Sequence, residues 1–144
     1  MIEQPSMAHL ELSHPGPEFD VLVAQEKLQR RIYNEMRQRY IPIAETEAEF
    51  LETFRFNKEA MDAEWQEVLD RLPWKSWKAN HRLRIADGEA LPDDVRLEIK
   101  YELVDALHFL LNMMIRAGFD SWHEVESFYW AKNKENFDRQ ERGY

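Results

Sequence analysis

The sequence contains no cysteine and only four glycines among its 144 residues. Without cysteine the chain can form neither a disulfide framework nor a thiolate metal site, which fits a reducing cytosol. The scarcity of glycine, together with 12% aromatic residues, suits packed helices better than a disordered or turn-rich chain. The composition therefore predicts a folded, helix-rich protein.

A net basic charge and long apolar runs are also absent. The formal charge is −9, whereas broad contact with a nucleic-acid backbone requires a basic surface. No run approaches the roughly 18 apolar residues of a membrane span, and the N-terminus lacks a basic-then-apolar signal pattern. We therefore expect a soluble, cytoplasmic protein that binds neither a nucleic-acid polymer nor a membrane. A nucleotide substrate would need intervening metal ions.

The hydrophobic period predicts an all-α fold. Residues 1–17 contain three prolines and no period, which indicates an irregular N-terminal arm, and residues 18–144 are expected to form a single helical catalytic domain. A fourth helix should begin after Ser121, a plausible N-cap with Glu124 three residues later. The expected result is a helical bundle of four helices, or five if the second is interrupted near 54–57, where the period is poor. The predicted helices cover about 18–40, 45–71, 92–118 and 121–139.

The third predicted helix has one apolar and one acidic side. Past Asp105 it is apolar on most sides, so we expect it to be deeply buried. Glu102 and Asp105 are three residues apart, so their carboxyl groups can reach a common point. The apolar side contains Ile99, Leu103, Leu107, Leu110 and Met114, and the acidic stripe contains Glu98, Glu102 and Asp105.

The second predicted helix carries a parallel acidic pair, Glu64 and Glu67. If the two pairs faced each other, four negative charges would gather, and like charges at close range raise each other's pKa. Divalent cations with oxygen ligands, such as magnesium, relieve that repulsion. Acidic pairs at this spacing also occur on solvated helix faces, so spacing alone leaves both readings open.

Longer sequence strings distinguish the two readings. They are EWQE (64–67), WKSWK (74–78), EIKYELVDALH (98–108), YWAKN (129–133) and NFDRQERGY (136–144). Taken in order, they resemble the all-α dimeric dUTPase family of the MazG-like nucleotide pyrophosphohydrolase superfamily, most closely its T-even-phage dCTPase–dUTPase branch. The resemblance covers about residues 20–144. It implies an all-α NTP pyrophosphohydrolase fold, a homodimer, and hydrolysis of dCTP and dUTP, and of their diphosphates, to the monophosphates.

The resemblance also implies roles for individual residues. The magnesium ligands would be Glu64, Glu67, Glu102 and Asp105, with two or more Mg²⁺ ions and Mn²⁺ as a substitute. Gln25 and Gln29 would bind the pyrimidine base, although the family commonly has asparagine at the position of Gln29. Residues of the C-terminal region would contact phosphates, namely Lys132, Asn133, Asn136, Arg139 and Tyr144.

The two glutamines suggest a relaxed base preference. Cytosine presents an amino donor where uracil presents an acceptor, and a glutamine amide offers both a donor and an acceptor. If Gln25 and Gln29 face the base without being fixed by neighbours, either pyrimidine can be satisfied.

We expect the reaction to be metal-assisted attack of water on a phosphorus atom of the nucleotide. Glu64 or Glu67 would orient or deprotonate that water. The basic residues Lys75 and Lys78 would contact phosphates together with Lys132 and Arg139.

One histidine and three aromatic residues are expected to have structural roles and no part in catalysis. His108 should be a structural hydrogen bonder, and Phe128, Tyr129 and Trp130 should lie in the core and in a dimer contact.

Two alternative functions are a MazG-like pyrophosphohydrolase of different base specificity and a non-catalytic helical interaction protein. If the gene belongs to a phage, the protein would act in the host cytoplasm.

Overall fold

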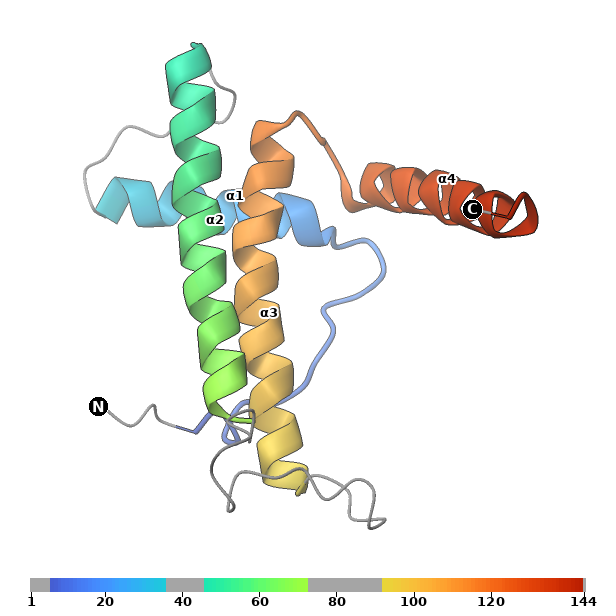
Figure 1. The fold of residues 1–144 in the computed structure, drawn as a ribbon. Helices are drawn as coiled ribbons and strands as arrows, with labels where there is room; N and C mark the ends of the chain where they lie inside the picture. Colours follow the sequence, from blue (N-terminus) through green and yellow to red (C-terminus); the bar gives the residue numbers. More distant parts are fainter. Residues whose placement is uncertain (1–5, 36–45, 73–91, 144) are drawn as a thin grey trace. The chain divides into compact units, whose positions relative to one another are not determined.

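The computed structural model describes residues 6–35, 46–72 and 92–143. These ranges contain four α-helices and no β-strand, which confirms the predicted all-α fold (Figure 1). Within the described ranges, no helix is both long enough and apolar enough to cross a membrane. The helices are α1 (Val21–Glu35), α2 (Glu47–Asp70), α3 (Asp93–Arg116) and α4 (Trp122–Glu141).

Local capping interactions fix the helix ends. The Asp20 carboxylate accepts the N–H groups of Leu22 (2.8 Å) and Val23 (3.1 Å) through Oδ1, so α1 starts three residues later than predicted. Ser121 is the N-cap of α4, as predicted, and its hydroxyl accepts the Glu124 N–H at 3.1 Å. At the end of α3, Gly118 has φ of 100°, a left-handed conformation that glycine adopts without strain.

The second helix is continuous, so the predicted interruption near 54–57 is wrong. Asn57 is buried in the middle of α2, where a polar residue weakens the apolar period. Its side-chain amide donates to the Thr53 carbonyl one turn earlier, at 2.8 Å. Because this bond is made within the helix, the buried amide is satisfied without breaking the helix.

The chain divides into two compact units, and both α2 and α3 contribute residues to each. Unit 1 consists of Met1–His14 and Glu52–Leu110. Within unit 1, α2 and α3 run side by side in opposite directions (Figure 1). Val68 of α2 and Ala106 of α3 are buried there, together with the acidic residues Glu98 and Glu102.

Unit 2 consists of Pro15–Leu51 and Leu111–Tyr144. Its buried residues include Leu22 of α1 with Leu111 and Met113 of α3. Helices α1 and α4 contact each other, and the Trp122 N–H at the start of α4 donates to Asp20 Oδ2 at 2.8 Å. Asp20 therefore caps α1 and also binds the first turn of α4.

The third helix is less buried within one chain than the sequence predicts. Leu103 and Val104 are 40% and 46% exposed, whereas Glu98 and Glu102 of the acidic stripe are buried. In unit 1 the acidic stripe of α3 is thus the enclosed side, and part of the apolar side faces outward.

The aromatic residues of α4 also lie outside the core. Phe128, Tyr129 and Trp130 are each about 60% exposed, so the predicted core position is wrong and only the dimer contact stays a prediction. The Phe128 ring packs edge-on against Phe119 with ring centroids 5.1 Å apart. Tyr129 and Trp130 pack edge-on against each other at 5.2 Å.

Candidate active site

Three of the four predicted carboxylates come together in unit 1. Glu64, Glu67 and Glu102 each offer one oxygen atom, and these atoms lie within 4.8 Å of one another. Glu64 and Glu67 are three residues apart on α2 and so share a helix face, while Glu102 is contributed by α3. We call these three residues the carboxylate cluster.

Burial and mutual repulsion raise the pKa values of Glu64 and Glu102. Burial is the larger cause for Glu64, and contact with Glu67 adds to it, so the Glu64 pKa rises from 4.5 to about 7. Burial and Glu67 also raise the pKa of Glu102, although hydrogen bonds from Arg71 oppose that rise. Two of the three side chains therefore hold a proton more tightly than an ordinary glutamate does.

Asp105 lies beside the cluster but outside its group of three. Its charge helps to raise the pKa of Glu64, so the two carboxylates interact. Burial raises the pKa of Asp105 itself, and His108 opposes the rise, with its Nδ1 3.9 Å from Asp105 Oδ1. This distance is too long for a hydrogen bond, and the contact is an ion pair only when His108 is protonated.

The donor set of the cluster fits a hard divalent cation. Glu64 Oε2 and Glu102 Oε2 are buried and have no hydrogen-bond partner, an arrangement that is costly for an ionised carboxylate. Oxygens bound to one Mg²⁺ ion at ~2.1 Å are at most about 4.2 Å apart, so a cluster spanning 4.8 Å needs only a small closure. The assignment of these residues as metal ligands stays a prediction.

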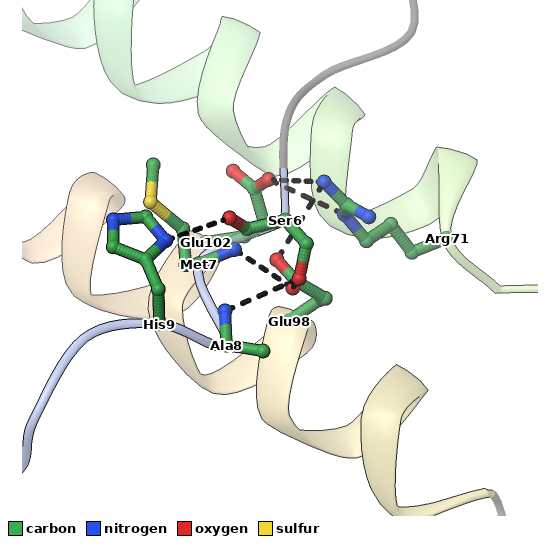
Figure 2. A network of polar contacts seen from close by, with 7 residues as sticks. All are labelled: Ser6, Met7, Ala8, His9, Arg71, Glu98 and Glu102. Carbon is green, nitrogen blue, oxygen red and sulfur yellow. Dashed lines mark hydrogen bonds and ion pairs between the residues drawn. The ribbon is translucent and has the colours of Figure 1, made fainter.

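Sequence reasoning missed a polar network that borders the cluster (Figure 2). Arg71, one residue after α2, donates through Nη2 to Glu102 Oε1 at 3.2 Å and lies 3.9 Å from Glu98 Oε2. Glu98 Oε1 in turn accepts the Ser6 hydroxyl at 2.5 Å and the Met7 N–H at 2.9 Å.

Helical spacing could have indicated part of this network. Arg71 follows Glu67 by four residues and Glu64 by seven, which places it on the same face of the chain as the cluster. Glu98 precedes Glu102 by four residues. No local pattern indicates Ser6, because 92 residues separate it from Glu98.

The predicted base-binding residue Gln25 is buried in unit 2 and already has a partner. It is 3% exposed, and its amide nitrogen donates to Asn112 Oδ1 at 2.8 Å. Gln29, one turn later on α1, is half-buried. Their role in binding a base stays a prediction.

The predicted phosphate residues of the C-terminal region lie on α4. Asn133 and Asn136 line a shallow hollow of about 170 Å³ with Phe137 and Gln140. Arg139 donates through Nε to Glu135 at 3.1 Å, and Lys132 is exposed. The structure thus places two of these residues at one hollow, and it does not place Lys132 or Arg139 in its lining.

Three predicted phosphate contacts cannot be placed. Lys75, Lys78 and Tyr144 lie outside the described residues.

The fold and the carboxylate cluster define a class: an all-α protein whose acidic residues, on two adjacent helices, are arranged to suit a divalent cation. No protein-family model matches the chain, and no solved structure does either. In an alignment 141 positions long, which covers 86% of this chain and 80% of the other protein, the chain is 37% identical to a dCTP pyrophosphatase of Enterobacteria phage T4. The chain belongs to the phage dCTP pyrophosphatase family, which confirms the resemblance seen in the sequence.

Two further relatives match shorter parts of their own length. A dCTP pyrophosphatase of Enterobacteria phage LZ5 is 40% identical over 72 residues, which are 49% of this chain and 41% of that protein. A DNA replication protein of phage T4 is 35% identical in an alignment 131 positions long, which covers 79% of this chain and 32% of that protein.

Proposed function

We propose that this protein hydrolyses dCTP to dCMP and pyrophosphate in a magnesium-dependent reaction. The observation that carries the proposal is the carboxylate cluster, whose three oxygens lie within 4.8 Å in a chain 37% identical to a dCTP pyrophosphatase. Hydrolysis of dUTP, and of the diphosphates of both nucleosides, belongs to the same proposal.

Glu64, Glu67 and Glu102, with Asp105 beside them, would hold two or more Mg²⁺ ions, for which Mn²⁺ can substitute. When bound, the metal supplies positive charge against the phosphates and lowers the pKa of the attacking water. Glu64 or Glu67 accepts the proton of that water. A new bond forms between the water oxygen and phosphorus, the bridging P–O bond breaks, and pyrophosphate leaves with its electron pair.

The amide of Gln25 suits cytosine in the orientation that Asn112 gives it. The Gln25 amide nitrogen donates to Asn112 Oδ1 at 2.8 Å, which fixes the orientation of the amide, and we expect its oxygen to be the atom that meets a base. A carbonyl oxygen accepts from the amino group of cytosine but is opposed by the O4 acceptor of uracil. This contact favours dCTP over dUTP, and the flipping amide expected from the sequence would require Asn112 to release Gln25.

Phosphate binding is assigned to the basic and amide residues of α4. Asn133 and Asn136, at the hollow, donate hydrogen bonds, while Lys132 and Arg139 add positive charge. Lys75, Lys78 and Tyr144 belong to the same proposal.

The exposed apolar residues support a homodimer. In unit 1 such residues lie on α2 and α3, and large apolar side chains left exposed in one chain are often covered by another subunit. Light scattering on the purified protein should give twice the mass of one chain, which is 17.4 kDa. The residues are Phe56, Trp65, Leu69, Leu103 and Val104.

A substrate panel tests the proposed activity. The protein is incubated with Mg²⁺ and each of dCTP, dUTP, dTTP, dATP and dGTP, and monophosphate and pyrophosphate are measured. We expect dCTP to be the best substrate and the purine nucleotides to be inert. Preferred hydrolysis of a nucleotide other than dCTP or dUTP would favour a MazG-like enzyme of different base specificity, and no pyrophosphate from any would favour a non-catalytic interaction protein.

A further inference from the structure

One guanidinium group serves two buried carboxylates at the edge of the cluster (Figure 2). The Arg71 Nε and Nη2 atoms both donate to Glu102 Oε1, at 3.3 and 3.2 Å. Nη2 also lies 3.9 Å from Glu98 Oε2, which is an ion-pair distance but too long for a hydrogen bond. The side chains of Glu98 and Glu102 are only 9% and 6% exposed, so each depends on protein groups for compensation.

The N-terminal arm holds Glu98 in place. Its Oε1 accepts both the Ser6 hydroxyl and the Met7 N–H, while Ser6 Oγ accepts the Ala8 N–H at 3.1 Å. The other oxygen, Oε2, is buried and has no hydrogen-bond partner. Glu98 is therefore a fixed carboxylate with one acceptor atom left over on the side of Arg71.

A metal ion bound through the unpartnered Oε2 of Glu102 would lie on the same carboxylate as Arg71, which donates to Oε1. Glu102 is both an Arg71 partner and a member of the cluster. Two cations on one carboxylate repel each other strongly where water is scarce. The guanidinium would need to move by only about 1 Å to bring its distance to Glu98 from 3.9 Å to that of a charged hydrogen bond.

We propose that Arg71 is a movable counter-ion, which neutralises Glu102 in the metal-free protein and shifts onto Glu98 Oε2 when Glu102 takes up a divalent cation. Glu98, held by Ser6 and Met7, is then a positioning residue for metal binding and not itself a ligand. The inference rests on the proposed metal-dependent function and explains why a fixed, buried carboxylate with a vacant acceptor lies next to the cluster.

A double-mutant cycle of metal affinity tests this inference. Binding of Mg²⁺ alone to the full chain is measured by titration calorimetry for wild type, Arg71→Gln, Glu98→Gln and the double variant. We expect Glu98→Gln to weaken Mg²⁺ binding about tenfold, or about 1.4 kcal/mol, because Arg71 loses its second site and stays on Glu102. Arg71→Gln should tighten binding several-fold. In the Arg71→Gln background, Glu98→Gln should change the affinity by less than about twofold.

The dependence of the Glu98→Gln effect on Arg71 distinguishes a movable counter-ion from a simple loss of negative charge. If Glu98 only adds negative charge or binds metal directly, Glu98→Gln will weaken binding equally in both backgrounds, and the inference is wrong. It is equally wrong if Arg71→Gln weakens binding. Lys58→Gln and Glu59→Gln, on the exposed surface of α2, make the same charge changes away from the cluster and should leave the affinity unchanged.

The Arg71→Lys variant and the wild-type protein provide two further measurements of Mg²⁺ affinity. If Arg71→Gln does not fold, Arg71→Lys replaces it, because lysine keeps the charge but cannot hold Glu102 through two nitrogens. Its Mg²⁺ affinity should then exceed that of wild type, and an equal or weaker affinity overturns the inference. A wild-type protein that binds no Mg²⁺ would overturn the proposed metal dependence as well, whereas binding without coupling overturns the counter-ion alone.

Discussion

Glu102 takes part in two sets of interactions in unit 1. It receives hydrogen bonds from Arg71, and it brings an α3 carboxylate to the two glutamates of α2. Its Oε2 is buried without a hydrogen-bond partner. Replacing Glu102 with glutamine therefore changes the charge of the cluster and hardly changes the shape of the side chain.

Replacing Glu102 with glutamine should abolish most of the activity. A neutral amide is a poor magnesium ligand, and the lost charge stabilisation of several kcal/mol corresponds to a decrease in kcat of at least about a hundredfold. Pyrophosphate release from dCTP and calorimetric Mg²⁺ binding are measured together, with the exposed Glu59→Gln as control. Full activity with normal Mg²⁺ affinity in Glu102→Gln would remove this residue from the metal site.

Replacing Asn112 with alanine should relax the base preference. Without the Asn112 acceptor the Gln25 amide can rotate and offer its nitrogen to uracil, so the ratio of kcat/KM for dCTP to that for dUTP should fall about tenfold. The mass and the helical circular dichroism of the variant are checked alongside. An unchanged ratio would mean that Gln25 does not read the base.

Helices are the scale at which sequence and structure agree best. The apolar period identified four helices because one turn of an amphipathic helix repeats its pattern locally, whatever the tertiary contacts. The poor period at Asn57 was misleading, since a bond to Thr53 within the helix satisfies the buried amide. The same local spacing put Glu64 beside Glu67, but no spacing could report that Ser6 contacts Glu98.

Asp20 caps α1 and also binds the first turn of α4, so its removal should weaken both helix starts. Asp20→Ala removes the acceptor of the Leu22 and Val23 N–H groups and of the Trp122 N–H. Losing an N-cap costs about 1–2 kcal/mol, which corresponds to a decrease in Tm of roughly 4–8 °C for a chain of this size. Thermal unfolding followed by circular dichroism measures it.

Asp20→Asn is the matched variant for this test. It keeps one acceptor oxygen, so it should lose about half as much Tm as Asp20→Ala. If Asp20→Ala unfolds at the wild-type temperature, the two helix starts do not depend on this carboxylate.

For the whole molecule, the raised pKa values of Glu64, Glu102 and Asp105 link stability to pH. Glu64 has a pKa of about 7 when folded and about 4.5 as an ordinary glutamate, and the pKa values of Glu102 and Asp105 are raised as well. Between these values the folded state binds more protons than the unfolded state, so stability decreases as pH rises. The pKa of Glu98 is lowered by its hydrogen bond from Ser6, and its contribution is lost only at acid pH, below this window.

We therefore expect the Tm of the metal-free protein to fall between pH 5 and about pH 7.5, and Mg²⁺ to reverse the fall. Metal ligands must be deprotonated, so the rise in Tm on adding Mg²⁺ should be larger at pH 7.5 than at pH 5.5. Thermal unfolding is recorded at both pH values, with NaCl at matched ionic strength as the control for screening. In Glu102→Gln both the pH slope and the Mg²⁺ response should shrink, because one of the converging charges is gone. A metal-free Tm that rises across this window, or an Mg²⁺ response that is the same at both pH values, would show that the cluster is not the group that links protons and metal to folding.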